Sequence, residues 1–257
     1  MAEPVIQPAQ TPSAPFVDSP LLSGPAKSER LGIALAIDLG SQDLALAVSR
    51  QNRMPRASVV VTSAARTIIR LSKAGEKVES IVVHGSTTDP TLHPEFREIA
   101  TNLRDLRNKW FAKAKLCIVS EDPHFESPEV RHSIAVFDKI FLRMEWGTAK
   151  TFAAMTGRKS TDLANLTANL GHLENIIVQA RFVRGDADNT TEGEVKAWVK
   201  RLVDLKPREV HIQSPDAKSL GKKVRPAPKS RLAEIAAEVT EKSGIPVTVL
   251  ASDSPLI

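Results

Sequence analysis

The chain has 257 residues, of which 42% are hydrophobic and only 4% aromatic, and it carries a formal net charge of +5. This length suits one large α/β domain or two small ones, and so mild a charge does not by itself indicate nucleic-acid binding. The single cysteine, Cys117, excludes an internal disulfide and any metal site or iron–sulfur cluster held by several cysteines of this chain.

The composition of the N-terminal segment sets it apart from the rest of the chain. Residues 1–30 hold six prolines among Ala, Ser, Gln and Thr. Because such a segment buries little apolar surface, we predict a disordered tail over 1–30 and one folded domain over 31–257. No apolar run approaches the ~20 residues of a membrane span. The N-terminus also lacks the blocks of a signal peptide, so we expect a cytoplasmic protein without membrane contacts.

From Leu31 onward, short apolar runs alternate with segments of helical period. The runs predict strands over 31–38, 79–85, 114–120, 137–144, 175–182 and 208–214, and a last short run follows at 245–250. Helices are predicted over 57–74, 93–110, 127–137, 160–173, 190–205 and 230–244. Three helix ends have specific signals, which are Ser127 and Thr191 as N-caps and Gly244 at the C′ position.

Strands that alternate with helices in this way predict a parallel sheet covered by helices, as an open sheet or a barrel. Ligand sites in such folds lie at the carboxyl ends of the strands. Polar and charged residues, which are suited to binding a ligand, lie at or just after the ends of most of the predicted strands. They include Asp38, His84, Thr88, Asp89, Glu121, Glu145, Gln179, Arg181 and Gln213.

The sequence lacks the motifs of several common binding sites and active sites. The sequence contains no GxGxxG after the first strand, no phosphate-binding GxxxxGK[ST], no GxSxG and no HExxH. A metal site formed by His84, Asp38 and Glu145 is sterically conceivable, but polar residues at strand ends more often satisfy one another. His93 before Pro94 is interpreted as a helix-entry residue, and Cys117 as a buried, inert thiol. The basic stretch 218–232 is interpreted as a solvated loop, since no aromatic residues accompany it.

The order of several segments resembles a known family. "GSTTDPTLHPEFREI" (85–99) resembles the "GxGEPTLHPEF" segment of radical S-adenosylmethionine (SAM) proteins, and "CIVSEDPHFESPEVR", "LRMEWGTAKTFAAMTGR" and residues 178–212 are similar to later segments of its small iron–sulfur oxidoreductase branch. The resemblance covers about residues 31–250. It implies a partial (βα)6 barrel of the TIM type.

The family's defining cysteines are missing. Its CxxxCxxC motif after the first strand binds three irons of a [4Fe–4S] cluster, whose fourth iron is chelated by SAM. In this sequence those positions fall at Asp43, Ala47 and Arg50, or one residue later. These residues cannot replace thiolates as cluster ligands. No [4Fe–4S] cluster is therefore expected, although the resemblance leaves SAM or nucleotide binding open.

The family's ligand positions are altered as well. Its Gly-Glu pair, which contacts the SAM amino group, becomes Thr88-Asp89, and Glu121 and Glu145 replace other strand-end residues. Trp146 is large enough to fill part of the barrel mouth. The candidate pocket at the barrel mouth consists of Thr88, Asp89, Glu121, Glu145, Gln179 and Arg181.

Three functions remain open at this point. The first is a pseudoenzyme that serves as a scaffold, a regulator or an accessory subunit beside a protein partner. The second is a non-radical enzyme or a SAM- or nucleotide-binding protein that uses the same barrel mouth. The third is a radical SAM oxidoreductase whose cluster ligands come from another chain. Catalytic residues cannot be assigned from the sequence.

Overall fold

A computed structural model describes residues 19–40, 54–121, 125, 127–170 and 173–252. Its main sheet has eight strands in the order β1-β2-β3-β4-β5-β6-β8-β10. The strands are β1 (Leu22–Ser28), β2 (Gly32–Asp38), β3 (Ser80–His84), β4 (Lys115–Ser120), β5 (Lys139–Arg143), β6 (Ile176–Arg181), β8 (Glu209–Gln213) and β10 (Val247–Val249). All neighbours pair in parallel except β1, which runs antiparallel to β2.

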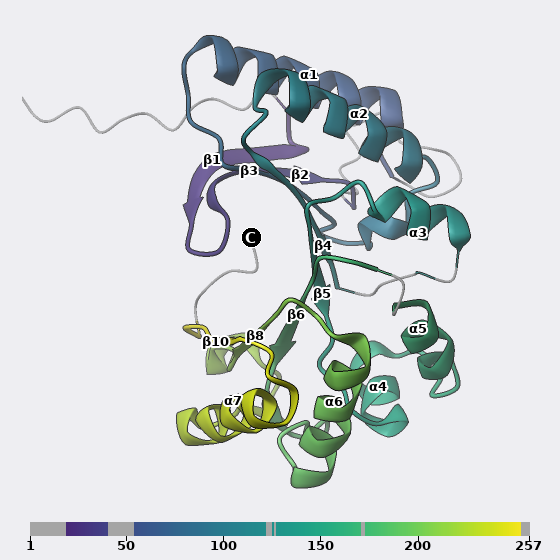
Figure 1. Ribbon diagram of the computed structural model, residues 1–257, viewed down its shortest axis with the longest axis vertical. Helices are drawn as coiled ribbons and strands as arrows, with labels where there is room; N and C mark the ends of the chain where they lie inside the picture. The colour runs from purple at the N-terminus through teal and green to yellow at the C-terminus, as the bar shows by residue number, and fades with distance from the viewer. Residues whose placement is uncertain (1–18, 41–53, 122–124, 126, 171–172, 253–257) are drawn as a thin grey trace, which may run out of the picture.

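Seven α-helices connect the strands in the described part of the chain. They are α1 (Ala57–Lys73), α2 (Phe96–Trp110), α3 (Pro128–Ile134), α4 (Ala149–Thr156), α5 (Asp162–Leu170), α6 (Glu192–Leu205) and α7 (Lys229–Ser243). The sheet is strongly curved, and the helices cover its convex side (Figure 1). In the described residues no hydrogen-bonded pair joins the end strands β1 and β10. The fold is therefore a mixed α/β fold in the form of an open, partial barrel.

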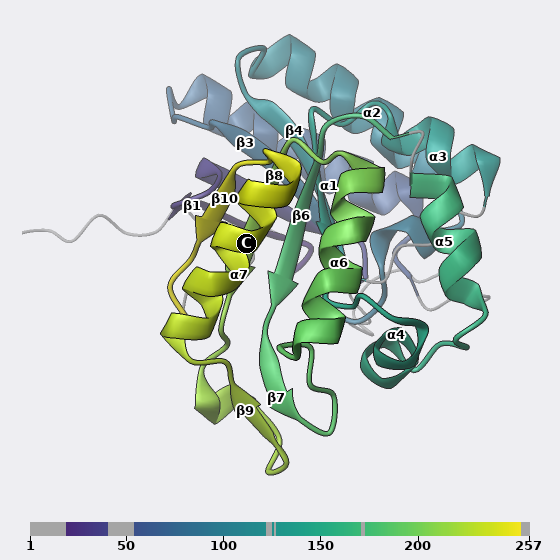
Figure 2. The ribbon, with the colours of Figure 1, turned by 60° about the horizontal axis from the view of Figure 1, so that its bottom comes forward.

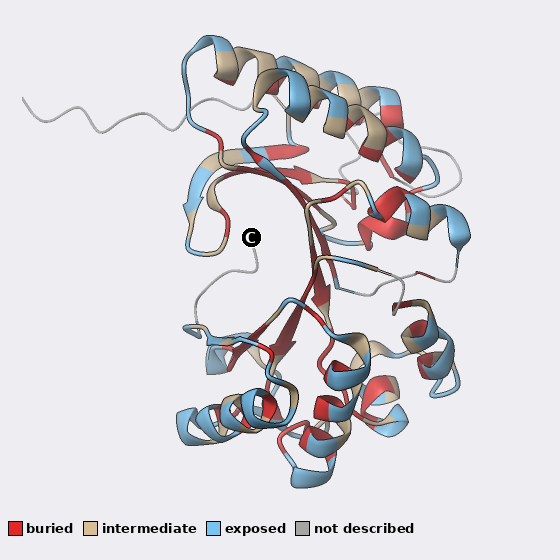
Figure 3. Ribbon diagram, in the orientation of Figure 1, coloured by how far each residue is buried: buried red, intermediate tan, exposed pale blue. Residues whose placement is uncertain are grey.

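The two faces of the sheet contribute to separate apolar clusters. Outward residues such as Ile81 and Val83 of β3 belong to the large cluster between the sheet and the helices. Val82, one residue away, belongs to a smaller cluster on the concave face together with Cys117 and Phe141. Side chains alternate between the faces because the strand period is two residues. The inner strands β3, β4, β5, β6 and β8 are mostly buried, whereas the edge strands β1 and β10 are largely intermediate or exposed (Figure 3).

The predicted strands and helix caps are confirmed. Each of the six predicted strands contains an observed strand, and the last apolar run contains β10. Ser127 and Thr191 accept hydrogen bonds from the backbone N–H of Val130 and Glu194 at the starts of α3 and α6. Gly244 ends α7 with a φ of 68°, a left-handed conformation that glycine adopts without steric cost.

The predicted disordered tail of residues 1–30 is wrong at its C-terminal end. Residues 22–28 form β1, which pairs with β2, and Leu21 and Leu22 are buried in the outer core. The two leucines bury the apolar surface that the proline-based interpretation considered missing. Pro25 is tolerated because it lies at a register irregularity on an edge strand. Residues 1–18 lie outside the described residues.

A second small sheet was not predicted. β7 (Val183–Gly185) and β9 (Val224–Pro226) form an antiparallel ribbon that extends from the body of the molecule beyond α7 (Figure 2). Part of the basic stretch 218–232 therefore lies in an ordered strand, where Arg225 faces Arg184 in the register. Among the described residues, no helix is both long and apolar enough to cross a membrane.

Candidate functional site at the strand ends

Asp89 organises the turn that follows β3. Its Oδ1 accepts hydrogen bonds from the backbone N–H of Thr91 at 2.9 Å and from Thr91 Oγ1 at 2.5 Å. Its Oδ2 accepts from Ser120 Oγ at 2.8 Å and from the backbone N–H of Glu121 at 3.0 Å. Both carboxylate oxygens are thus engaged by protein donors. The side chain caps the short 3-10 helix η1 (Pro90–Leu92) and ties the turn to the end of β4.

Gly85 allows this turn to fold back on itself. A Cβ atom at Gly85 would lie 1.9 Å from the carbonyl oxygen of Thr88, and one at Gly40 would lie 2.3 Å from the same oxygen. A second carboxylate supports the turn from the end of β2. Asp38 Oδ1 accepts from the backbone N–H of Gly40 and of Ser86, both at 2.9 Å. The two carboxylates fix the backbone of the turn.

A cavity of about 290 Å³ opens beside this turn. It is lined by His84, Ser86, Thr87, Thr88, Asp89 and Glu121, among others. Three of the predicted site residues, Thr88, Asp89 and Glu121, are therefore brought together. Burial lowers the pKa of His84, although the charges of Asp38 and Glu121 oppose that shift. His84 is consequently disposed to be a neutral imidazole at the wall of the cavity.

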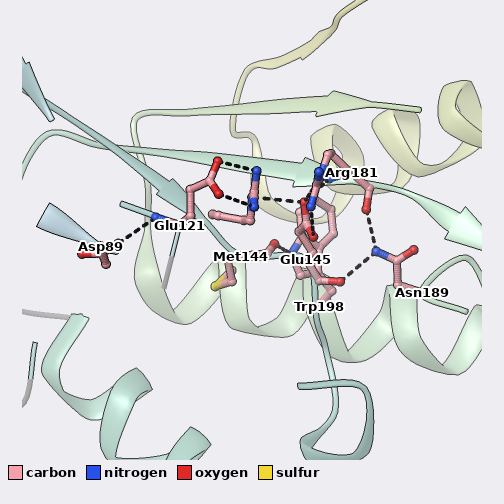
Figure 4. A network of polar contacts seen from close by, with 8 residues as sticks. Asp89, Glu121, Met144, Glu145, Arg181, Asn189 and Trp198 are labelled. Atoms are coloured by element: carbon pink, nitrogen blue, oxygen red, sulfur yellow. Dashed lines mark hydrogen bonds and ion pairs between the residues drawn. The ribbon is translucent and has the colours of Figure 1, made fainter. Parts of the chain in front are cut away.

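Four charged side chains form a row across the ends of β4, β5 and β6, which we call the charged row: Glu121, Arg143, Glu145 and Arg181 (Figure 4). Arg143 contacts Glu121 through two hydrogen bonds of 2.6 and 2.7 Å. Arg181 Nε donates to Glu145 Oε1 at 2.7 Å, and Arg143 Nε lies 3.5 Å from the same oxygen. The two cations and two anions alternate, so the row neutralises itself.

Burial and pairing have opposite effects on the two arginines. Burial lowers the pKa of Arg143 despite the nearby carboxylates of Glu145 and Glu121. Burial also acts against the charge of Arg181, but the hydrogen bond and charge of Glu145 outweigh it and raise that pKa. Glu145 is only 8% exposed, whereas the Glu121 side chain is 45% exposed. Glu145 is thus the anion on which the row depends.

Two residues that the sequence did not single out, Asn189 and Trp198, bind the backbone next to the charged row. Asn189 Nδ2 donates to the carbonyl oxygens of Glu145 and Arg181, both at 2.8 Å, and Asn189 Oδ1 accepts from the N–H of Val183. Trp198 Nε1 of α6 donates to the carbonyl oxygen of Met144 at 2.8 Å. Little in the sequence points to these two roles, because Trp198 lies on the apolar face of a helix and Asn189 lies in a polar turn.

The remaining candidates lie apart from the turn. Gln179 is buried on the concave face at the level of Arg143. Trp146, expected to fill the barrel mouth, packs edge-to-face on Phe152 of α4 with ring centroids 4.9 Å apart, although it also borders a pocket with Glu145 and Arg181. The metal site considered for His84, Asp38 and Glu145 does not form. In the described part of the chain no three His, Cys, Asp or Glu side chains are grouped as metal ligands.

Two single-residue predictions are confirmed. His93 enters helix α2 through two contacts, in which Nε2 lies 2.6 Å from the carbonyl oxygen of Pro55 and Nδ1 accepts from the backbone N–H of Glu95. Cys117 is fully buried, and burial raises the pKa of its thiol to about 12. The predicted cluster positions Asp43, Ala47 and Arg50 lie outside the described residues.

Comparison with known proteins shows only distant structural likeness. No protein-family model matches the chain, and no curated protein matches it. A domain of pyruvate-formate lyase-activating enzyme from Bacteroides vulgatus aligns with a TM-score of 0.47 and 12% identity, over 63% of this chain and 94% of that one.

Two further solved structures align less well. The AsfvAP:AG structure has a TM-score of 0.34 and 11% identity over 85% of this chain and 77% of its own. The apo form of 3-keto-D-glucoside 4-epimerase from E. coli has a TM-score of 0.31 and 11% identity over 77% of this chain and 79% of its own. At these scores the comparisons do not assign the chain to a family.

Proposed function

We propose that this chain is a radical-SAM-like protein that holds no [4Fe–4S] cluster and acts as a scaffold, regulatory or accessory subunit for a protein partner. The observation that carries the proposal is the state of Asp89. It stands where the family has its SAM-contacting glutamate, and four protein donors engage both of its oxygens. A carboxylate so committed stabilises a turn and has little remaining capacity for a ligand's amino group.

Two further observations support the proposal. The chain contains one cysteine, which cannot bind a cluster that needs several thiolates. The charged row at the strand ends is paired internally, so a ligand that binds Arg143 or Arg181 through its own charge has to displace Glu121 or Glu145. Displacing a buried partner leaves an uncompensated charge, which is costly.

The proposal is tested by anaerobic reconstitution of the full chain with iron and sulfide. We expect the iron and sulfide content and the visible absorbance to equal those of Cys117→Ala, a variant with no thiol, which sets the background of adventitious binding. Calorimetry with SAM is expected to show no binding heat. Stoichiometric iron and sulfide with cluster absorbance above that background would contradict the cluster-free assignment.

A second candidate function is favoured by the cavity beside Asp89. The cavity is lined by both His84 and Glu121, an imidazole and a carboxylate that are suited to acid–base chemistry or to hydrogen bonding of a nucleotide. Under this alternative, SAM, S-adenosylhomocysteine or a nucleotide binds at the strand ends without radical chemistry. A thermal-shift titration with these compounds separates the two candidates, because only the second expects stabilisation that is lost in His84→Leu.

A further inference from the structure

The net charge of the chain is concentrated in one projecting element. Residues 183–188 and 216–229, which we call the basic ribbon, comprise β7, β9 and the segments beside them (Figure 2). They carry six basic and three acidic side chains and thus a net charge of +3, whereas the whole chain of 257 residues has +5. All six basic residues are exposed: Arg184, Lys218, Lys222, Lys223, Arg225 and Lys229. The mild overall charge is therefore unevenly distributed, and the ribbon is a positive surface.

Two guanidinium groups are held next to each other on the exposed face of the ribbon. Arg184 of β7 lies directly opposite Arg225 of β9 in the antiparallel register. Opposite residues of such a pair have Cβ atoms about 4.5–5.5 Å apart, so like charges there repel each other. In the described part of the chain, no carboxylate lies within ion-pair distance of either arginine, and the nearby pair of Lys223 and Asp186 is long, at 3.9 Å. This arrangement favours an external anion.

The other acidic side chains of the ribbon stabilise local turns. Asp188 Oδ1 accepts hydrogen bonds from the backbone N–H of Thr190 at 2.8 Å and from its hydroxyl at 2.7 Å. Asp216 accepts from the backbone N–H of Lys218 at 3.0 Å and caps the short 3-10 helix η2 (Ala217–Ser219). Because these carboxylates are engaged by their own backbone neighbours, they do not pair with the two opposed arginines.

The start of α7 adds positive potential beside the ribbon. Two residues separate the end of β9 from Lys229, the first residue of α7. Within the described residues no side chain caps this helix end, and its first turn holds no acidic residue. The first N–H groups of a helix lack intrahelical partners and carry a partial positive charge, which favours phosphate groups. The ribbon and the helix end therefore select for the same kind of ligand.

The chemistry of the ribbon favours double-stranded DNA over other polyanions. Arginine forks match the oxygen geometry of phosphate groups. The ribbon contains no aromatic residue that could stack the bases of a single strand. A two-stranded ribbon fits the major groove of B-form DNA, whereas the major groove of A-form RNA is too deep and narrow. Protein interfaces have an apolar centre, but the large hydrophobic side chains that are exposed among the described residues, Leu92, Val203 and Val249, lie outside the ribbon.

We propose that the basic ribbon docks on duplex DNA through the phosphate groups, with Arg184 and Arg225 as its central contacts. Contacts of this kind position a protein on the duplex without reading the base sequence. The inference is independent of the proposal on the cluster, because it uses neither the Asp89 turn nor the cysteine content of the chain.

Fluorescence anisotropy of the full chain with a short labelled DNA duplex, across a salt series, tests the proposal. We expect binding at low salt and a slope of the logarithm of the association constant against the logarithm of salt concentration of about −2 to −5, since each neutralised phosphate contributes about −0.9. An RNA duplex, single-stranded DNA and polyglutamate should bind at least about fivefold more weakly. Absence of duplex DNA binding at low salt would overturn the proposal. Equal or tighter binding of the RNA duplex, the single strand or polyglutamate would overturn the choice of DNA as the partner.

Two double variants locate the binding. Arg184→Gln combined with Arg225→Gln is expected to weaken duplex binding at least about tenfold and to reduce the magnitude of the salt slope by about 2. The control is Lys73→Gln combined with Lys113→Gln, which removes the same charge from exposed positions at the ends of α1 and α2 and should change binding less than about twofold.

Thermal melting checks that both double variants fold. Removing two like charges that face each other relieves repulsion, so the melting temperature of the Arg184→Gln, Arg225→Gln variant should not fall. Unchanged DNA binding in that folded variant would refute the assignment of the ribbon. Equal losses in the two double variants would refute it as well, because binding would then follow the net charge of the protein alone.

Discussion

Asp89 and Ser120 join the turn after β3 to the end of β4 through a hydrogen bond of 2.8 Å between Ser120 Oγ and Asp89 Oδ2. Two segments that are 31 residues apart are thereby fixed at the mouth of the partial barrel. The same carboxylate caps η1 through Thr91. At a position that the family resemblance associates with a cofactor, this protein therefore has a side chain that links two segments of the fold.

Replacing Asp89 should destabilise the fold. Asp89→Asn exchanges one carboxylate oxygen for an amide N–H that faces donors, and we expect a loss of about 1–3 kcal/mol in the free energy of unfolding. Asp89→Glu keeps the charge, but its longer arm does not fit the 3-10 cap, so it should not restore stability. Urea denaturation measures both changes.

Asp216→Asn is the matched control for this prediction. Asp216 caps η2 (Ala217–Ser219) by accepting from the N–H of Lys218, but it is exposed to solvent. Because water can replace the lost contact, we expect a change below about 0.5 kcal/mol. Similar losses in Asp89→Asn and Asp216→Asn would show that burial of the Asp89 carboxylate has no role.

The two acidic members of the charged row should differ in their effect on stability. Glu145→Gln leaves Arg181 and Arg143 without their buried counter-charge, and we expect a loss of about 2–4 kcal/mol. Glu121→Gln removes a carboxylate that is half exposed, and the expected loss is below about 1 kcal/mol. Chemical denaturation of the two variants, at low and high salt, makes the comparison. A larger loss in Glu121→Gln would contradict the order of importance inferred here.

Acid should weaken the entry to helix α2 through His93. Burial lowers the pKa of His93 in the folded state, so the unfolded chain binds the proton more readily. The stabilising contribution is therefore present above the unfolded value of about 6.5 and is lost as the pH falls through the lower folded value. Protonation of Nδ1 also breaks its hydrogen bond with the N–H of Glu95.

His93→Gln should reduce the dependence of stability on pH between about pH 6.5 and 4 relative to the wild type, and thermal denaturation across that range measures it. His132→Gln is the control, since His132 lies exposed near the end of α3. If the two variants kept the same pH dependence as the wild type, the assignment of a folded-state shift to His93 would be wrong.

Glycine is required at position 85 but not at position 193. Gly85→Ala places a methyl group 1.9 Å from the carbonyl oxygen of Thr88, so the turn must move, and we expect a loss of about 1–3 kcal/mol. Gly193 lies in the first turn of α6 with open space around it, and Gly193→Ala should raise the stability by up to about 1 kcal/mol. Thermal melts of the two variants are expected to shift in opposite directions. A tolerated Gly85→Ala would mean that the turn is less constrained than its contacts indicate.

Local sequence patterns were enough to predict the main parallel strands and most of the helices. Near-continuous apolar runs such as 79–85 identify buried parallel strands, and caps such as Ser127 and Gly244 are local signals that need no distant contact. The same logic misjudged β1, because proline content is a local property whereas pairing with β2 depends on a partner outside the segment. The ribbon of β7 and β9 was missed for a related reason, since each strand has only three residues.

The contacts that the strand-end residues make depend on how distant segments of the chain pack together. The sequence pattern predicts that Asp89, Glu145 and Arg181 lie at the same end of the sheet. It does not predict that Asp89 accepts hydrogen bonds from four donors, or that Glu145 pairs with Arg181. Those outcomes depend on contacts across 31 and 36 residues, for which periodicity carries no information. The same holds for Gln179, His211 and Gln213, whose common cavity arises from the register between β6 and β8. Local patterns fix which side chains are polar, and the register of the sheet fixes which of them come together in the folded protein.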